Sequence, residues 1–329
     1  MRQGLVAHRN AAPRTTGPAH AASPRTALGL SPAPRTLGGP HVPAGRSASA
    51  EPAVVAATPH RREPLSRTLA GQGPEQVSSL AAHLLGRFRV TLNEAPVDNL
   101  PSGRSRALLE YLLTHRDPWP PREALMEVFW PGATPAAARN SLNVAVHTLR
   151  RAFRAVDDVQ VLKFEQGSYR LHPDLRLWVD VDGFDHHVQA GRQLEAVGDL
   201  AGAMAEYELA VSLYQGDFLA DDPYEEWPVL TREHLRLTHL DTVDRLSYLY
   251  FSQGRYAPCA AMCQRILERD PCQEDAHRRL MRCYRRQGQL HLALRQYRIC
   301  VEALRAELGI DPAAETIALH EQIRRRESV

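Results

Sequence analysis

The sequence predicts a mainly α-helical protein with a small β component: a disordered tail, a winged helix-turn-helix domain, and then a tetratricopeptide-like helical repeat domain. Three observations carry this prediction. Residues 81–175 read in order as strands, three helices and a β-hairpin. Residues 176–329 look almost wholly helical and repeat a pattern around glycines, two of which stand 34 residues apart. Residues 1–80 hold 11 of the 24 prolines and no Phe, Tyr or Trp.

The N-terminal segment, residues 1–80, is predicted to be disordered because it cannot bury enough apolar area to offset the entropy of its chain. It repeats the tripeptide Pro-Arg-Thr at 13–15, 24–26 and 34–36, and its charge is basic. Two interpretations stay open. The segment is either a basic arm that moves along an anionic polymer, or a tail of biased composition with no specific role.

The first half of residues 81–175 predicts strands and two helices. LLGRFRVTL, from Leu84 on, contains aromatic and β-branched residues and alternates in part, so strands are expected through Val97. Residues 103–115 space their leucines as the inner side of a helix. A second helix is expected from Pro121 to about Trp130, because proline is tolerated in the first turn and a Pro-Gly pair follows.

The second half of this region predicts a third helix and a hairpin. Thr134 is a candidate N-cap with Pro135 at the first helical position. After the helix, VQVLKF and YRL flank residues 165–168, whose glycine favours a tight β-turn. Strands, three helices and a hairpin in this order are typical of a winged helix-turn-helix domain.

The third helix has two unlike faces when its residues are placed at about 100° each. The apolar face contains Leu142, Val146, Leu149, Phe153 and Val156. The polar face contains Asn140, Asn143, His147, Arg150 and Arg154, with Arg139 and Arg151 at its borders. A polar face by itself is compatible with a merely solvated helix surface.

The composition of this polar face favours DNA binding over simple solvation. No Asp or Glu occurs from Arg139 through Arg154, although a solvated helix gains stability by mixing charges. Asn and Arg are also the side chains that read adenine and guanine in the major groove. We predict that Asn140, Asn143 and His147 contact base edges and that Arg139, Arg150, Arg151 and Arg154 contact phosphates. The hairpin adds Lys163 and Arg170 for phosphate or minor-groove contact.

Residues 176–329 predict three helix pairs of a tetratricopeptide-like solenoid, aligned on Gly198, Gly254 and Gly288. A small residue lies at the same distance after each of the three glycines. Large apolar residues lie at other fixed distances before and after each glycine. The first two glycines are farther apart, which predicts an insert. Asp270-Pro271 and Asp311-Pro312 are expected to start helices. The curved face of such a solenoid usually holds a peptide or another domain.

No motif for catalysis, a cofactor or a metal stands out. The five cysteines lie between Cys259 and Cys300 without a CxxC pair, and Cys259 and Cys263 occupy repeat positions expected to be buried. Lys163 is the only lysine and lies in LKFE, which excludes a GxxxxGK[ST] phosphate loop. With no secretory leader or bilayer-spanning run, the sequence predicts a cytoplasmic protein that is not an enzyme.

Residues 84–329 resemble the SARP-type bacterial transcriptional activators, in which a response-regulator-type winged helix precedes a bacterial transcriptional activator domain. The resemblance rests on ARNSLNVAVHTLRRAF at 138–153, GSYRL at 167–171, VDVDGF at 179–184, GDFLADDPYEEWPVLTREHLR at 216–236 and ELGIDPAAET at 307–316. It implies binding to promoter DNA, often as a homodimer, and recruitment of RNA polymerase through its sigma factor. It also implies that the loop around 131–136 touches the polymerase.

The predicted function is therefore that of a sequence-specific DNA-binding transcriptional activator. The alternative is a protein-interaction scaffold in which the repeats bind a partner and no DNA sequence is read. Dependence of binding on DNA sequence and on salt separates the two hypotheses.

Overall fold

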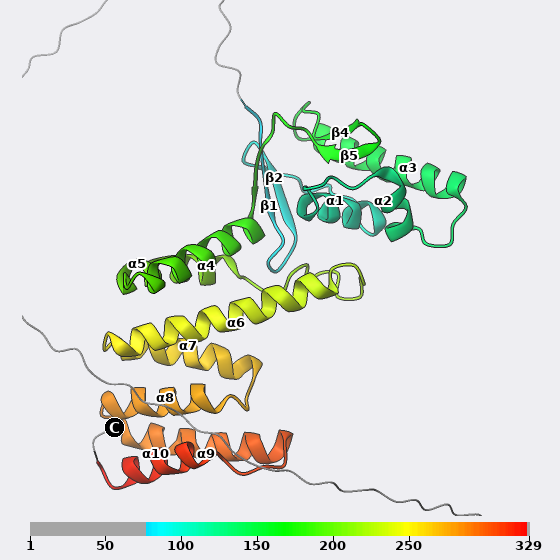
Figure 1. Ribbon diagram of the computed structural model, residues 1–329. Coiled ribbons are helices and arrows are strands. Elements are labelled where there is room, and N and C mark those ends of the chain that lie inside the picture. The colour runs from blue at the N-terminus through cyan, green and yellow to red at the C-terminus, as the bar shows by residue number, and fades with distance from the viewer. Residues whose placement is uncertain (1–76, 328–329) are drawn as a thin grey trace, which may run out of the picture. The chain divides into compact units, whose positions relative to one another are not determined.

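The computed structural model describes residues 77–327, and Figure 1 shows the order of their helices and strands. The predicted disorder and the Pro-Arg-Thr repeats of the N-terminal segment lie outside the described residues, apart from residues 77–80. The described part is mainly helical with two small sheets, as the sequence predicted.

A four-stranded sheet with the order β3-β2-β1-β6 opens the described part. Its strands are β1 (Ser79–His83), β2 (Arg89–Leu92), β3 (Ala95–Pro96) and β6 (Arg176–Val179). The prediction that strands begin near Leu84 was wrong, because the first strand, SLAAH, contains no β-branched residue and no Phe, Tyr or Trp and so gives a weak β signal. β6 runs parallel to β1, with Leu80 opposite Leu177. The predicted domain border between 175 and 176 stays a prediction, since β6 lies directly after it.

Three helices and a hairpin follow in the predicted order. They are α1 (Arg104–Thr114), α2 (Arg122–Phe129), α3 (Pro135–Arg154), β4 (Leu162–Glu165) and β5 (Ser168–Leu171). The predicted N-cap is confirmed, since the Thr134 hydroxyl accepts a hydrogen bond of 3.3 Å from the backbone N–H of Ala137. The hairpin turns at Gln166 and Gly167, whose φ angles are 50° and 82°.

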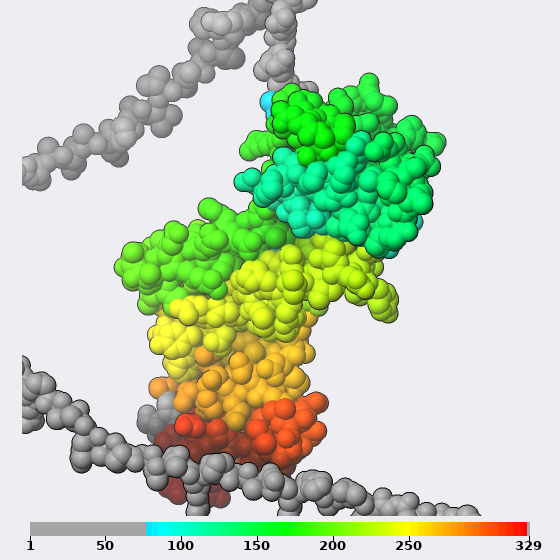
Figure 2. Space-filling view, turned by 45° about the vertical axis from the view of Figure 1, so that its right-hand side comes forward, coloured from blue at the N-terminus to red at the C-terminus, as the bar shows by residue number. Residues whose placement is uncertain are grey.

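The repeat region consists of α4 (Asp180–Ala196), α5 (Leu200–Leu213), α6 (Val229–Ser252), α7 (Tyr256–Arg269), α8 (Glu274–Arg286), α9 (Leu290–Glu307) and α10 (Ala314–Arg324). Each of α4 to α9 packs against the helix that follows it, and the colours in Figure 2 succeed one another in the same way. Gly198, Gly254 and Gly288 lie between paired helices with φ of 84°, 72° and 77°. This left-handed conformation ends a helix and favours glycine.

Two predicted helix starts in the repeats were wrong. Asp270 and Asp311 lie outside helices, which begin later at Glu274 and Ala314. The Asp270 carboxylate instead accepts a hydrogen bond of 3.0 Å from the backbone N–H of Cys272. The Asp311 carboxylate accepts one of 2.9 Å from Arg305. Both aspartates therefore stabilise the turns that lead into the helices.

The predicted insert is the segment between α5 and α6 together with the extended α6, which has 24 residues. The segment between α5 and α6 connects the repeat region to the strands that precede α1. The backbone N–H of Leu219 donates a hydrogen bond of 2.8 Å to the carbonyl of Leu84, and the N–H of Gly86 donates one of 3.1 Å to Asp217. Phe218 and Phe184 are fully buried in the same apolar core as Leu84. The winged helix and the first repeat helices therefore share one core.

Close packing of α4 on α5 depends on a glycine. A Cβ atom on Gly191 would lie 2.5 Å from the Cε1 atom of Tyr207, which is fully buried. The Tyr207 hydroxyl donates a hydrogen bond of 2.9 Å to Glu195, so the ring is held at both ends. A larger residue at position 191 must therefore displace a fixed side chain or separate the helices.

We expect Gly191→Ala to lower the free energy of unfolding by about 2 kcal/mol, because overpacking outweighs the better helix propensity of alanine. Gly183→Ala on the same helix is the matched control. Its Cβ would meet only the flexible Leu213 side chain at 3.1 Å, so little change is expected. Urea denaturation followed by circular dichroism measures both variants, and equal stability of the two would contradict the packing argument.

Candidate nucleic-acid interface

Helix α3 is anchored through its apolar face. Leu142, Val146, Leu149 and Phe153 are at most 3% exposed, and they belong to the core that α1 and α2 also line. Val156, just past the helix, is half-buried against the same core. The predicted inner face of this helix is thus confirmed, and its opposite face is left to solvent.

Six of the candidate DNA-binding residues are exposed on that opposite face: Arg139, Asn140, Asn143, His147, Arg151 and Arg154. Among residues 77–327, neither Arg139 nor Arg151 makes an ion pair. Arg154 lies 3.8 Å from the Asp158 carboxylate, and both side chains are well exposed, so the pair is weak. The face carries positive charge that no nearby carboxylate fixes.

Arg150 differs from the other candidates of α3. It is half-buried, and its guanidinium donates hydrogen bonds of 3.0 and 3.3 Å to the backbone carbonyl of Leu162 in β4. The side chain therefore ties α3 to the hairpin. Arg150 therefore stabilises the position of the hairpin beside the helix. Only its remaining N–H groups are free to donate to a phosphate.

Asn143 is oriented by the hairpin. The hydroxyl of Tyr169, on β5, donates a hydrogen bond of 3.4 Å to the Oδ1 atom of Asn143. Tyr169 is only 7% exposed, so its ring is fixed in the core. The amide nitrogen of Asn143 has no partner among the described residues and can donate to a base. This contact was missed from the sequence, because it depends on how the hairpin docks on α3.

The hairpin candidates carry their own counter-ion. Lys163 lies 3.1 Å from the Glu165 carboxylate, and Arg170 contacts the same carboxylate. Phe164, which follows Lys163, is 44% exposed. The centre of its ring lies 5.8 Å from the Arg122 guanidinium. Arg122 borders the hairpin, because its backbone N–H donates a hydrogen bond of 3.0 Å to the carbonyl of Gly167. Glu165 lowers the net charge that the hairpin offers to DNA.

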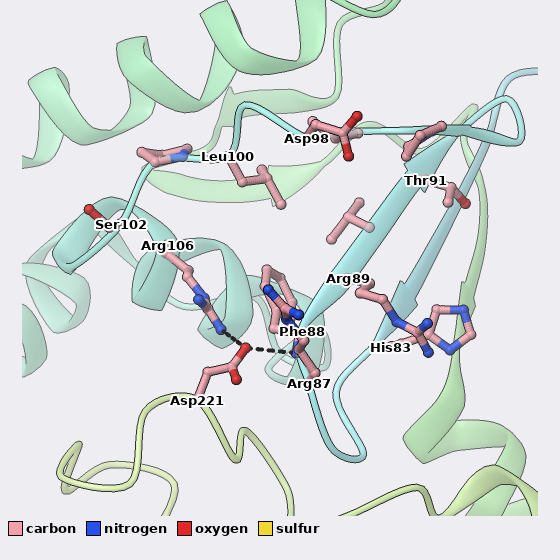
Figure 3. Close-up of a pocket in the computed structure, with 14 residues that line it drawn as sticks. His83, Arg87, Phe88, Arg89, Thr91, Asp98, Leu100, Ser102, Arg106 and Asp221 are labelled. Carbon is pink, nitrogen blue, oxygen red and sulfur yellow. Dashed lines mark hydrogen bonds and ion pairs between the residues drawn. The ribbon is translucent and has the colours of Figure 1, made fainter.

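A separate concave surface, shown in Figure 3, has no lining residue from α3. Its volume is about 830 Å³, and it is lined by residues from β1 to α1 together with Asp221. Asp221 accepts hydrogen bonds of 3.0 Å from Arg106 and 3.2 Å from the backbone N–H of Phe88, as the dashed lines in Figure 3 show. These bonds fix the segment before α6 to β2 and α1. The cavity therefore belongs to the junction with the repeats rather than to the face of α3.

The cysteines lie where the repeat pattern predicted. Cys259 and Cys263 are fully buried in the core of the repeats. A hydrogen bond with Cys263 lowers the pKa of the Cys259 thiol, but the hydrogen bond with Cys283 together with burial raises it to about 12. Within residues 77–327, no group of three or more His, Cys, Asp or Glu is placed to hold a metal ion. In the same range no helix is long and apolar enough to cross a membrane.

Two family models match consecutive parts of the chain. The family described as "Transcriptional regulatory protein, C terminal" matches residues 100–171, which include α1 to β5. The family described as "Bacterial transcriptional activator domain" matches residues 179–324, which include α4 to α10. The transcriptional regulatory protein MoaR1 of Mycobacterium tuberculosis is 26% identical over 271 residues, which cover 81% of this chain and 84% of MoaR1.

The two matched families, in this order along the chain, and MoaR1 make the chain similar to the SARP-type bacterial transcriptional activators. A second relative is EmbR of Mycobacterium tuberculosis, 28% identical over 254 residues that cover 74% of this chain and 63% of EmbR. The solved structure of Mycobacterium tuberculosis EmbR in complex with a low-affinity phosphopeptide has the same fold. It superimposes with a TM-score of 0.61 at 24% identity, covering 77% of this chain and 66% of that one.

One exposed residue of α3 was absent from the prediction. Val144 lies on the free side of α3 with 58% of its surface exposed. The helical pattern alone could have found it, because Val144 falls out of phase with the buried residues. It was passed over because only polar side chains were assigned to the free face.

Proposed function

We propose that this SARP-type activator binds promoter DNA by placing the exposed face of α3 in the major groove. One observation carries the proposal. The face is held rigidly by a buried opposite side, it carries cations without fixed counter-ions, and it presents amide groups between them. A helix of this kind fits the major groove, and its cations are attracted by the phosphate charges of DNA.

The residues divide into two roles under this proposal. Asn140, Asn143 and His147 face base edges, whereas Arg139, Arg151 and Arg154 contact phosphates. Lys163 and Arg170 of the hairpin, and Arg150 with its free N–H groups, contact the backbone of the duplex. Phosphate contacts fix the register of the helix, and the amide contacts provide the sequence preference.

We infer the further partners from the family. Residues 131–136, which form the end of the α2–α3 loop and the start of α3, are exposed throughout and are available to RNA polymerase and its sigma factor. A homodimer on repeated half-sites is proposed on the same ground. Because the ligand is chromosomal DNA, the protein acts in the bacterial cytoplasm, and because the matched families are regulatory, it is not an enzyme.

We expect Asn143→Ala and Arg154→Ala to affect DNA binding differently. Asn143→Ala lowers the preference for matched over scrambled sites by about tenfold, since a bidentate amide contact discriminates by about 1–3 kcal/mol. Arg154→Ala weakens both sites alike and makes the slope of log K against log salt less steep by about 0.9. Tyr169→Phe, which removes only the hydroxyl that orients Asn143, is expected to lower the preference by less than Asn143→Ala does.

The measurement uses fragments selected from the source genome and scrambled copies, in gel shifts over a series of salt concentrations. If Asn143→Ala weakened binding to the matched and the scrambled fragments equally, the assignment of Asn143 to a base contact would be contradicted. A wild-type protein that prefers no fragment would contradict DNA reading as a whole and favour the protein-interaction scaffold.

A further inference from the structure

Val144 points away from the core and lies next to Arg151, at the border of the polar face of α3. With 3.6 residues per turn, Asn140, His147 and Arg151 all lie within about 60° of it around the helix axis. All of them are exposed, and Val144 itself is 58% exposed. The apolar residues that pack α3 into the core lie on the far side of the helix.

Exposure alone does not distinguish this residue, because single exposed apolar side chains are normal on protein surfaces. The position and the residue type of Val144 do distinguish it. A β-branched residue has a lower helix propensity than Ala, Gln, Lys or Arg, so valine is a poor choice for a merely solvated helix position. Here it lies directly beside the row of amide, imidazole and guanidinium groups proposed to meet DNA.

The side chain of Val144 is also well ordered for recognition. In a helix, valine adopts one strongly preferred rotamer, so its methyl groups have fixed directions. The hydroxyl of Thr148, one turn on, donates a hydrogen bond of 2.8 Å to the backbone carbonyl of Val144 and is thereby turned toward the helix. The surface around Val144 is thus a small apolar area framed by polar side chains.

We propose that Val144 contacts the 5-methyl group of a thymine in the major groove and so requires thymine at one position of the bound site. The inference rests on the proposed function and deepens it, because it names the base that an apolar residue reads. Thymine is the base that presents a methyl group in the major groove, and apolar side chains are its usual partners. The amides of Asn140 and Asn143 then read bases beside this thymine.

The test uses duplexes of the selected site in which one thymine at a time is replaced by deoxyuridine. This replacement removes the methyl group and leaves base pairing intact. For wild-type protein, one replacement is expected to weaken binding about fourfold, the effect of losing one buried methyl contact. Val144→Ala is expected to bind the thymine site about fourfold more weakly and to bind the thymine and deoxyuridine sites equally.

Two variants serve as controls. Val144→Thr keeps the shape and one methyl group, so it retains part of the thymine preference. Arg154→Ala weakens both duplexes alike and keeps the full difference between them. Circular dichroism of each variant reports whether α3 still folds.

The outcomes separate this inference from the proposed function. If the wild-type protein selects a site but no deoxyuridine replacement weakens binding, or if Val144→Ala keeps the full thymine preference, the inference is overturned while DNA reading stands. If no site is selected at all, the proposed function fails and the inference with it.

Discussion

Alanine in place of Asp180 is expected to lower the free energy of unfolding by about 4 kcal/mol. The Asp180 side chain is buried, with a relative exposure of 1%. Its carboxylate accepts hydrogen bonds of 2.8 and 2.9 Å from the backbone N–H of Leu84 and one of 2.9 Å from that of Leu85. Alanine leaves two buried amide donors unsatisfied, and each costs about 1–3 kcal/mol.

The same contact couples α4 to the strands of the winged helix. Asp180 is the first residue of α4, where the helix dipole favours a negative charge. Burial raises the pKa of its carboxyl above the ordinary value, although the hydrogen bonds from Leu85 and Leu84 oppose this rise. The charged form is therefore held by these two amides. This gives a physical reason for the aspartate in VDVDGF, one of the segments that carry the family resemblance.

The measurement is urea denaturation of the full chain at pH 7. Asp182→Ala is the matched control, because Asp182 is exposed and pairs with Arg116 at the surface, where an ion pair contributes less than about 1 kcal/mol. Asp180→Asn keeps one acceptor oxygen and is expected to fall between the two. Equal effects of alanine at 180 and 182 would show that the buried hydrogen bonds do not stabilise the junction.

Local signals made most of α3 predictable. Its cap, its proline and the spacing of its apolar residues lie within one stretch of chain, and the structure confirms each of them. The glycines between repeat helices were predictable for a similar reason, since the left-handed backbone that ends a helix favours one residue type.

Contacts between distant segments were not predictable from such signals. The pairing of β1 with β6 joins strands that are far apart in sequence, and SLAAH alone gives little indication of a strand. The hydrogen bonds of Arg150 to Leu162 and of Tyr169 to Asn143 arise only when the hairpin packs on α3. The sequence could therefore suggest residues for the proposed interface but could not show which of them hold the others in place.

Glu110 is the second buried acid of the junction, and it lies among more carboxylates than cations. Its side chain is fully buried on α1. The Arg106 guanidinium donates a hydrogen bond of 2.8 Å to Glu110 and lies 3.0 Å from Asp221 and 3.3 Å from Asp222. One cation thus serves three carboxyl groups, two of them from the segment before α6.

Burial is the largest cause that raises the pKa of Glu110 to about 7, and the nearby Asp222 raises it further against the opposing effect of Arg106. Between the ordinary value near 4.5 and this raised value, the folded protein holds a proton that the unfolded chain has lost. The contribution of Glu110 to stability is therefore full below about pH 4.5, falls as the pH rises toward 7, and stays low above it.

We expect Glu110→Gln to remove this loss of stability at high pH. Glutamine can accept a hydrogen bond from Arg106 and donate one to Asp222, as the protonated acid does. The variant should match the wild type near pH 5 and exceed its free energy of unfolding by about 3 kcal/mol at pH 8. Urea denaturation across this range measures the difference. Glu127→Gln on the exposed side of α2 is the control and should show no such dependence on pH. A constant difference between Glu110→Gln and wild type from pH 5 to 8 would mean that Glu110 stays ionised throughout, with Arg106 compensating its charge fully.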